Sequence, residues 1–430
     1  MDYKKIIQNS IDYIEDNLKT QITAAELSNQ AGYSIFYYYR LFQSYVGMPV
    51  MQYILRRRLI HAVYEIHCGR KRIDVILEYG FDTYAGFYKA FRREFGCTPS
   101  DFLKKGRAKR PYKLNLNEEK HMNISDKKAL KLLKHWNLEN ESISNIYYKG
   151  NGEKDDTALY VGKDFVLKFS DDLGKVKNEV KLCKAMESTG LYVSSPVLTT
   201  DGREYVQDGE LFFYVTKRIF GSQMVSNDFY DDLEKARFVG EIIGQLHLIL
   251  SQTEMPVDDV DLYRTVKDYA MLKARKIFSF SEQFYRDYID DFGKLYNKLP
   301  KQIIHRDPNP ANIIVSQDKW GFIDFKLSER NLRIYDPCYA ATAVLSESFD
   351  ENDTVMLSKW LEIYKNVICG YDSVVKLTDE EYKALPYVVI ANQLVCTVYF
   401  SEHDKYTELF EINKRMTAWL VSVIDELKLK

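Results

Sequence analysis

One short segment constrains this chain more than any other. Ile303-Ile304-His305-Arg306-Asp307 is followed by Asn312, and Gly-Phe-Ile-Asp324-Phe arrives with its Asp twelve residues after that Asn. Transfer of a γ-phosphoryl group needs an Asp that holds the acceptor proton, an Asn nearby that binds metal, and a second metal-binding Asp. Asp307, Asn312 and Asp324 supply these residue types at this spacing. The sequence therefore predicts a phosphoryl-transfer site.

The residues between Asn312 and Asp324 predict a β-hairpin. Ile313 to Val315 and Gly321 to Ile323 are two apolar runs that flank Gln317-Asp318-Lys319. Pairing 313 with 323, 314 with 322 and 315 with 321 would place Asn312 opposite Asp324. Directly opposed residues have Cα atoms roughly 4.5 to 5.5 Å apart. This register predicts that the two side chains share one metal ion.

A nucleotide-binding lobe is predicted upstream. Thr157 to Val161 and Phe165 to Phe169 have the pattern of two strands joined by a turn at 162–164. Lys175 to Ser188 has helical periodicity, and Glu179 falls within its apolar face. A carboxylate on a buried face is costly without a partner. Lys168, a cation among apolar strand residues, is the predicted partner and is placed to reach the α- and β-phosphates of a nucleotide.

A glycine-containing loop precedes these strands. Gly150-Asn151-Gly152-Glu153 has two glycines, where a complete phosphate-covering loop has three. Glycine lets the backbone approach a phosphate closely. We assign Gly150 and Gly152 to the nucleotide site as a short form of that loop.

From about residue 125 to the end, the chain resembles the aminoglycoside phosphotransferase and choline kinase-like family, which are small-molecule kinases with the protein-kinase fold. No long activation segment with Ala-Pro-Glu follows Asp324, in contrast to protein kinases. The resemblance implies ATP (or GTP) and Mg²⁺ as cofactors. It also implies a role for each matching residue: Lys168 and Glu179 on the nucleotide side, Asp307 as the catalytic residue, Asn312 and Asp324 as metal ligands, and Asp336 as the residue that orders the catalytic region.

The motif departs from the family pattern at two positions. Asn309 stands where the family often has His, and Lys326 follows Asp324-Phe325 where Gly, Asp or Glu is commoner. Lys326 is expected to put a positive charge near the metal. Two hypotheses follow: an active kinase that modifies a small hydroxylated compound, or an inactive kinase-like domain that only senses a ligand.

The first hundred residues carry a second, independent signal. Thr23-Ala-Ala-Glu26 is a capping box, and Gly32-Tyr33-Ser34 predicts a turn before a helix from Ile35 to Tyr45. A similar arrangement recurs at 73–95, with a helix, the turn Gly80-Phe81-Asp82 and another helix. A long helix over 50–67 would join the halves. Helix, short glycine turn and helix form the helix-turn-helix arrangement.

The second half reads Ile73-x4-Glu78-Tyr-Gly80-Phe81-x5-Phe87-x3-Phe91-x3-Phe95-Gly-x-Thr98-Pro99-x2-Phe102, which closely resembles the AraC-type DNA-binding domain. The resemblance implies two recognition helices, at 34–45 and 83–95, in successive major grooves about 34 Å apart. Core positions match Tyr38, Phe42, Phe87 and Phe91. The residues expected to contact bases are Phe36, Tyr39, Arg40, Tyr84, Tyr88 and Lys89, with Arg92 and Arg93 on phosphates.

Some of these assignments have alternatives. Phe36 and Tyr39 belong to an unusually aromatic run, and either could pack in the core instead. Arg40 and Lys89 are the strong hydrogen-bond donors of the set, so thymine methyl groups are expected to contribute through apolar contact.

Charge separates the two regions. Residues 1–112 hold 18 Lys and Arg against 11 Asp and Glu, a net charge of +7, whereas the rest of the chain has a net charge of −9. A basic domain joined to an acidic one favours double-stranded DNA as a partner of the first alone. The expected organisation is an all-α double helix-turn-helix domain at 1–106, a linker at 107–124, and an α+β, two-lobed kinase-like domain with lobes at 125–221 and 222–430.

The sequence predicts a cytoplasmic transcription regulator. The N-terminus lacks an apolar signal region, and the six cysteines lack metal-binding or disulfide spacing. The apolar segment Tyr387 to Phe400 is too short to span a bilayer, so no membrane partner is expected. Besides DNA, the expected partner is a small-molecule ligand or substrate, and RNA polymerase is a further candidate.

Overall fold

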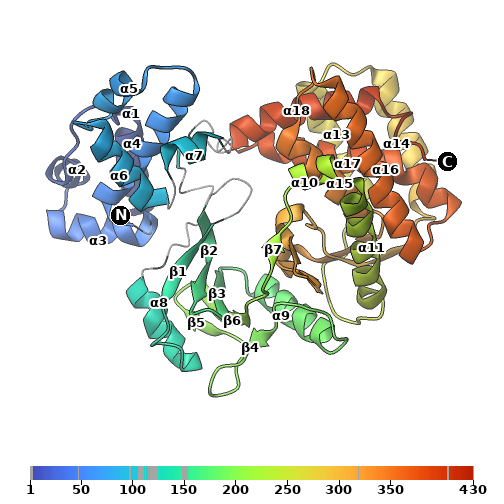
Figure 1. The fold of residues 1–430 in the computed structure, drawn as a ribbon, viewed down its shortest axis with the longest axis horizontal. Coiled ribbons are helices and arrows are strands. Elements are labelled where there is room, and N and C mark those ends of the chain that lie inside the picture. The colour runs from blue at the N-terminus through green and yellow to red at the C-terminus, as the bar shows by residue number, and fades with distance from the viewer. Residues whose placement is uncertain are drawn as a thin grey trace. The chain divides into compact units, whose positions relative to one another are not determined.

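The computed structural model describes residues 3–46, 48–95, 98–104, 111, 113–114, 116, 124, 126–147, 154–317, 319–403 and 406–429. The chain forms two compact units, Met1–Gly162 with His403–Glu408 and Lys163–Glu402 with Leu409–Lys430. Both are drawn in Figure 1. The division at 162 falls inside the lobe expected at 125–221, so the four-part organisation remains a prediction.

The first unit begins with the helical domain shown in blue in Figure 1. Its helices are α1 (Tyr3–Asp16), α2 (Ala24–Ala31), α3 (Ile35–Val46), α4 (Val50–His67), α5 (Arg72–Glu78), α6 (Tyr84–Phe95) and α7 (Pro99–Lys104). The predicted pair of helix-turn-helix units is therefore present, as α2–α3 and α5–α6, with α4 as the joining helix.

Both helix-turn-helix turns have the same local construction. Gly32 and Gly80 have φ of 75° and 81°, a left-handed conformation that glycine adopts without steric cost. The next residue in each turn closes the helix end, with Tyr33 N–H donating to Ser28 O and Phe81 N–H to Ile76 O, both at 3.0 Å. This repeated geometry explains why the sequence signal for the two turns was strong.

Side-chain caps start the second helix of each unit. Ser34 Oγ accepts from Tyr37 N–H at 3.4 Å, and Thr83 Oγ1 accepts from Gly86 N–H at 3.1 Å. Thr23 likewise accepts from Glu26 N–H at 3.2 Å. The predicted caps Thr23 and Ser34 therefore act as caps, and Thr83, for which no cap was predicted, does the same in the second unit.

The core of this domain includes residues from the expected linker. Tyr38, Phe42, Phe87 and Phe91 are fully buried, as predicted. Leu114 and Leu116 lie in the same core, although the region 107–124 was expected to be a linker without core residues. Apolar residues in a charged segment gave too weak a periodic signal to predict this packing.

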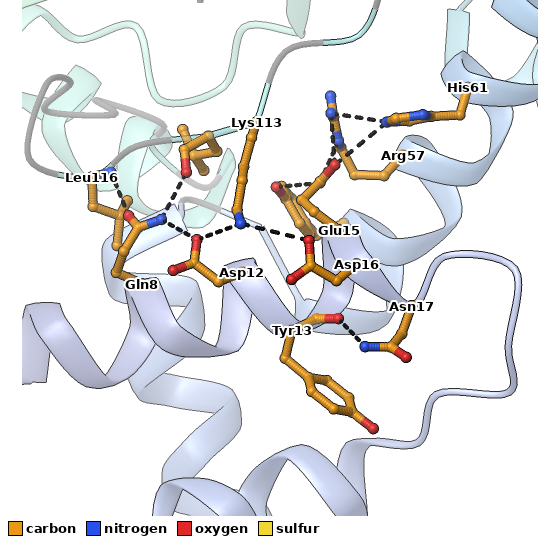
Figure 2. A network of polar contacts seen from close by, with 12 residues as sticks. Gln8, Asp12, Tyr13, Glu15, Asp16, Asn17, Arg57, His61, Lys113 and Leu116 are labelled. Carbon is orange, nitrogen blue, oxygen red and sulfur yellow. Dashed lines mark hydrogen bonds and ion pairs between the residues drawn. The ribbon is translucent and has the colours of Figure 1, made fainter. Parts of the chain in front are cut away.

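Polar contacts fasten that segment to α1, as Figure 2 shows. Gln8 donates to Leu114 O at 2.9 Å and accepts from Leu116 N–H at 2.7 Å. Lys113 Nζ lies 3.1 Å from Asp12 Oδ1 and 3.8 Å from Asp16 Oδ1. The side-chain amide of Gln8 thus makes hydrogen bonds to the backbone of Leu114 and Leu116 of the kind that a neighbouring strand would make.

A buried carboxylate joins α1 to α4 in the same view. Glu15 accepts from Arg57 Nε at 2.6 Å and Nη2 at 2.9 Å, and from the Tyr53 hydroxyl at 3.0 Å. His61 Nε2 lies 3.4 Å from Glu15 Oε2. Burial alone would raise the pKa of Glu15, but hydrogen bonds from His61 and Arg57 outweigh it and lower the pKa to about 2.

Glu15→Gln should lower the free energy of opening of α1 and α4 by about 2 kcal/mol at neutral pH. A carboxylate whose pKa is depressed on folding stabilises the fold above its unfolded pKa, near 4.5, and loses that contribution as pH falls toward 2. Hydrogen-exchange protection factors of α4 in the full chain measure this. The exposed Asp16, changed to Asn, is the control; an equal loss in both variants, or a difference that persists at pH 2, would contradict the prediction.

The first unit also contains a short helix and two strands. These are α8 (Asp126–Leu133), a 3₁₀ turn (Lys134–Trp136), β1 (Ile143–Tyr147) and β2 (Lys154–Val161). β1 and β2 are antiparallel, with Ile143 opposite Val161 and Asn145 opposite Leu159. β2 contains the predicted strand at 157–161.

The second unit opens with antiparallel strands and one helix, which are drawn in green in Figure 1. They are β3 (Phe165–Ser170), α9 (Leu173–Glu187), β4 (Pro196–Val197), β5 (Val206–Asp208), β6 (Leu211–Lys217) and β7 (Ser222–Gln223). β6 pairs with β3, β4 and β5. β3 and α9 are the strand and helix predicted for the nucleotide side.

The rest of this unit is mainly helical. Its elements are α10 (Asn227–Asp231), α11 (Leu233–Leu250), α12 (Leu262–Thr265), a π-helix (Val266–Ala270), α13 (Met271–Ile277), α14 (Glu282–Tyr296), β8 (Lys301–Ile304), a 3₁₀ turn (Pro310–Asn312), β9 (Ile313–Val315), β10 (Trp320–Phe322), a 3₁₀ turn (Phe325–Leu327), β11 (Glu329–Leu332), α15 (Tyr335–Ser348), α16 (Thr354–Val374), α17 (Asp379–Ser401) and α18 (Thr407–Ser422). The helical domain followed by this mixed α/β unit matches the predicted fold class.

Helix α17 is the core helix of this unit. By length and composition it could cross a membrane, but 67% of its most apolar stretch is buried inside the protein. Core helices of soluble proteins have the same pattern, so this is weak evidence for a membrane span.

Among the described cysteines, all five are free thiols.

Candidate functional site

The loop that carries Asp307 is held in place by one buried carboxylate. β8 ends at Ile304, and the next two backbone N–H groups donate to Asp336: His305 N to Oδ2 at 2.8 Å and Arg306 N to Oδ1 at 2.9 Å. His247 Nε2 from α11 lies 2.9 Å from the same Oδ2. Asp336 is completely buried at the start of α15. The ordering role that the family resemblance implied for Asp336 therefore has a direct structural basis.

His305 connects this loop to the strand that leads to Asp324. Its Nε2 lies 3.0 Å from Ile323 O, and its Nδ1 accepts from Asp307 N–H at 3.3 Å. A carbonyl oxygen can only accept, so Nε2 carries the proton and Nδ1 is the acceptor. The imidazole is buried. His305 thus connects the Asp307 loop to the strand that leads to Asp324.

Asp307 is oriented by two asparagines. Asn309 Nδ2 donates to Asp307 Oδ1 at 2.8 Å, and Asn312 Nδ2 donates to Asp307 Oδ2 at 3.2 Å and to Asp307 O at 2.9 Å. Asn309 Oδ1 also caps the following 3₁₀ turn through Ala311 N–H, at 2.9 Å. Burial raises the pKa of Asp307, while the hydrogen bond from Asn309 opposes that rise. The carboxylate is held with a fixed orientation beside Asn312.

The hairpin between Asn312 and Asp324 forms, but the predicted register was wrong by one residue. Ile313 pairs with Phe322, Ile314 with Gly321 and Val315 with Trp320. Ser316 N–H donates to Lys319 O at 2.8 Å, which closes a two-residue turn in place of the three-residue turn assumed. Asn312 O accepts from Ile323 N–H at 3.0 Å, so Asn312 lies opposite Ile323 and not opposite Asp324.

Asp324 leaves the strand immediately after that pair. Its φ is 68° and that of Arg306 is 77°, and these are two of the three non-glycine residues with positive φ in the part of the chain described here. Such conformations cost of order 1–3 kcal/mol each and cluster at functional sites. The ladder of β9 and β10 ends at Phe322, so Asp324 lies in the turn that follows it.

The Asp324 carboxylate lies in a cationic environment. Lys326 Nζ is 3.8 Å from Asp324 Oδ1. Burial would raise the pKa of Asp324, but the positive charges of Lys326 and Lys168 outweigh it, and the pKa lies below its ordinary value. Within the described residues, Oδ1 is buried and has no hydrogen-bond partner. A buried anionic oxygen without a donor is a site that a cation would satisfy.

The predicted pair of Lys168 and Glu179 forms between β3 and α9. Both side chains are buried, at 8% and 1% exposure, and the Lys168 ammonium contacts Glu179 Oε1. Tyr214 lies on β6 opposite Lys168, and its hydroxyl donates a hydrogen bond to Glu179 Oε2. Burial would lower the pKa of Lys168, but the charges of Glu179 and Asp324 outweigh it and raise the pKa. Lys168 is therefore a fixed positive charge.

The donor set suits a hard divalent cation. Asn312 uses its amide nitrogen on Asp307, which leaves its carbonyl oxygen as a metal-binding atom, and Asp324 contributes Oδ1, which accepts no hydrogen bond within the described residues. Oxygen ligands of this kind are those that Mg²⁺ prefers. No cluster of three His, Cys, Asp or Glu side chains with metal-binding geometry occurs among the described residues. Phosphate oxygens and water would have to complete the shell of an ion held here.

Several site residues were not predicted, and two predictions cannot be examined. Gly150 and Gly152 lie outside the described residues. Tyr214 was missed because a buried strand tyrosine carries no motif, although its place opposite Lys168 follows from pairing β3 with β6. His247 was also missed, because its contact with Asp336 joins positions 89 apart in the sequence.

The first helix-turn-helix unit presents an aromatic surface. Phe36 is 75% exposed at the start of α3, and Arg40 is also exposed. Tyr39 is half-buried and packs partly against the core. The alternative of a core position is therefore excluded for Phe36 and partly correct for Tyr39.

The second helix-turn-helix unit, α5–α6, presents a basic surface. Lys89, Arg92 and Arg93 are exposed on α6, and with Ala85 and Tyr88 they line an open groove of about 500 Å³. Tyr84 is half-buried against Phe87 and Tyr88. Clustered cations on one helix face are the electrostatic pattern that attracts phosphate groups.

Comparison with protein families assigns both regions. A family model described as a helix-turn-helix domain matches residues 27–105, and one described as the phosphotransferase enzyme family matches residues 150–365. The second match covers half of the chain and spans Lys168, Glu179, Asp307, Asn312 and Asp324.

Curated helix-turn-helix regulators match about a quarter of the chain. HTH-type transcriptional activator AarP of Providencia stuartii is 34% identical over 96 residues, which are 22% of this chain and 71% of that protein. Regulatory protein SoxS of Escherichia coli (strain K12) is 31% identical over 103 residues, which are 24% of this chain and 96% of that protein. The Bacillus subtilis (strain 168) regulator YbfP is 33% identical over 103 residues, but this chain spans only 35% of its length.

Solved structures match the other region. An amicoumacin kinase in complex with AMP-PNP, Ca²⁺ and Ami has a TM-score of 0.50 and 15% identity, over 68% of this chain and 92% of that one. A microcompartment-associated aminopropanol kinase has a TM-score of 0.51 and 16% identity, over 71% of this chain and 99% of that one. At these identities the likeness shows a shared fold.

Proposed function

Because the chain belongs to the phosphotransferase enzyme family, with an N-terminal region that belongs to the helix-turn-helix transcriptional regulators, we propose that it is a DNA-binding regulator whose second half is a working small-molecule kinase. In this proposal the kinase region binds Mg-ATP (or GTP) and phosphorylates a small hydroxylated compound in the cytoplasm. The observation that carries it is Asp307 held by Asn309 and Asn312, with Asp324 and Lys168 in the same electrostatic network.

In the proposed reaction the acceptor hydroxyl donates a hydrogen bond to Asp307 and passes its proton to that carboxylate as it attacks the terminal phosphoryl group. Asn309 and Asn312 hold the carboxylate in one rotamer. Lys168, fixed by Glu179, contacts the phosphates of the nucleotide. Asn312 and Asp324 would hold Mg²⁺, which when bound neutralises charge on the phosphate oxygens.

The acceptor class is proposed from two lines of support. The two solved structures with the same fold are kinases of amicoumacin and of aminopropanol. Residues 113–430 have a net charge of −9, and the long-range field of such a region favours an acceptor that carries an amine as well as a hydroxyl. We propose an amino alcohol or amino sugar as the acceptor.

A product assay tests this proposal. The full chain is incubated with Mg-ATP and a panel of amino alcohols and aminoglycosides, and phosphorylated products are identified by mass spectrometry. We expect one class to be converted in preference to alcohols without an amine. Nucleotide binding without conversion of any acceptor would leave the kinase region as a ligand sensor.

The DNA-binding part is proposed to read an asymmetric operator. α3 offers the exposed Phe36 with Arg40, which suits apolar contact with thymine methyls, whereas α6 offers the basic groove around Lys89. Arg92 and Arg93 are proposed to contact phosphates, and Tyr39, Tyr84 and Tyr88 to contact bases at the edge of each helix. In transcription the same compound that is phosphorylated would set DNA occupancy, with RNA polymerase as a further proposed partner.

Arg40→Ala and Lys89→Ala should each cost about 1 to 3 kcal/mol of binding to the cognate operator and relax the base preference at one position. Each side chain is exposed at the face of its recognition helix. Binding-site selection from random DNA, followed by affinity measurement at fixed salt, determines both effects. Arg92→Ala is the comparison and should weaken specific and random DNA equally. Equal losses on random DNA for all three variants would show that none reads bases.

A further inference from the structure

Lys326 is the nearest cation to the expected metal ligand Asp324 among the ion pairs of the described residues. Its Nζ lies 3.8 Å from Asp324 Oδ1, and the side chain is mostly buried, at 16% exposure. Asp324 Oδ1 has no hydrogen-bond donor in the described part of the chain, so the ion pair with Lys326 is the main favourable electrostatic contact of this oxygen. Lys326 belongs to the 3₁₀ turn that follows Asp324, which fixes its backbone close to the carboxylate.

We propose that Lys326 is a built-in cation of the metal site, which takes the place of one of two divalent ions, so that the chain binds a single Mg²⁺ with its nucleotide. Kinases of this fold generally use an Asp and an Asn to hold two ions that neutralise the phosphates. An ammonium close to Asp324 cancels one of the charges that would recruit a second ion.

The surrounding charges support this assignment. Lys168 also acts on Asp324 electrostatically, but it is committed to Glu179 by direct contact. Asp307 is the other carboxylate in the network, and its oxygens are occupied by Asn309 and Asn312. One carboxylate, Asp324, therefore remains to balance Lys326 and an incoming cation. A site with one available carboxylate and a resident ammonium favours one divalent ion over two.

The inference rests on the proposed nucleotide site. Measurement of Mn²⁺ binding, with and without nucleotide, distinguishes a failure of the inference from a failure of that site. Electron paramagnetic resonance measures free Mn²⁺ during titration of the full chain, first alone and then with AMP-PNP. Lys326→Met removes the charge and keeps the apolar stem, Lys326→Arg keeps the charge, and Lys184→Met is a matched control at an exposed ion pair with Glu204, 2.7 Å long. Circular dichroism verifies that each variant is folded.

We expect Lys326→Met to bind Mn²⁺ about tenfold more tightly than wild type without nucleotide, a difference expected for one removed cation partly screened by water. With AMP-PNP the wild type should take up one Mn²⁺ and Lys326→Met two, while Lys326→Arg and Lys184→Met follow wild type. Two ions in the wild type, or unchanged Mn²⁺ affinity in Lys326→Met, would overturn the inference. No nucleotide binding in any variant would refute the kinase proposal and, with it, the one-ion count, whereas a tighter Lys326→Met site in the same experiment would still show that Lys326 opposes a cation at Asp324.

Discussion

Asp307→Ala is expected to abolish phosphorylation of the acceptor while leaving operator binding intact. A positioned general base contributes about 10²- to 10⁴-fold to rate, so kcat should fall by that factor. Asp307 is the only carboxylate among the described residues that both asparagines of the loop hydrogen-bond. Its removal takes away the acceptor of Asn309 Nδ2, whereas Asn312 Nδ2 keeps its hydrogen bond to the backbone carbonyl of residue 307. Steady-state assays of the full chain with Mg-ATP measure the loss. Operator affinity should stay within about twofold, since the two functions lie in different compact units.

An isosteric variant separates chemistry from structure. Asp307→Asn keeps the volume and can still accept from Asn309, so it should fold and bind nucleotide but lose turnover to the same extent as the alanine variant. Asp201→Asn, at an exposed ion pair 2.8 Å from Arg203, should be unaffected. Turnover that survives in both Asp307 variants would show that another group takes the proton.

Asp336→Ala should have the largest effect on stability in the chain. Its carboxylate accepts from His305 N–H, Arg306 N–H and His247 Nε2, all at 2.8 to 2.9 Å, and the bonds from His305 and His247 are fully buried. Removing it leaves two buried donors and one partly buried donor unsatisfied, which corresponds to a loss of about 3 to 5 kcal/mol in the stability of the second unit. Because the same contacts orient Asp307, turnover should fall as well.

Tyr371→Phe provides the graded comparison for that experiment. The Tyr371 hydroxyl lies 2.9 Å from His247 Nδ1 on the far side of the imidazole, so it is one step removed from Asp336. We expect a loss of about 1 kcal/mol for this variant, with little change in turnover. Chemical denaturation of the second unit, followed by hydrogen exchange in α15, compares the two. Equal losses of stability in the two variants would mean that Asp336 stabilises the unit mainly through the His247 imidazole, and that its hydrogen bonds to the backbone of residues 305 and 306 contribute little.

The sequence predicted the features that depend on local chemistry. Glycine at Gly32 and Gly80, caps at Thr23 and Ser34, and the apolar face of α9 are all local signals, and the corresponding elements form close to their expected bounds. The pairing of Lys168 with Glu179 was also predictable, because a buried carboxylate requires a nearby cation. The fold class followed from these elements together with the resemblance at both ends.

The features that were missed depend on geometry between distant segments or on one turn. The hairpin register differs because two turn residues replace three, and periodicity alone does not distinguish those cases. Leu114 and Leu116 lie in a segment dominated by charge, yet they join the core of the helical domain and contact Gln8, which is 106 and 108 residues earlier in the chain. The contact between His247 and Asp336 joins two helices and leaves no pattern in either.

The central claim is that the kinase region holds a working metal-nucleotide site, and calorimetric titration of the full chain with ATP tests it most directly. The comparison is wild type against Asp324→Ala, each with and without Mg²⁺, after circular dichroism has shown that both are folded. We predict binding that depends on Mg²⁺ and that weakens at least about tenfold when Asp324 is removed, because a metal-bridged phosphate then loses its charged ligand. Binding that is equal in both proteins, or absent from wild type, would contradict the account.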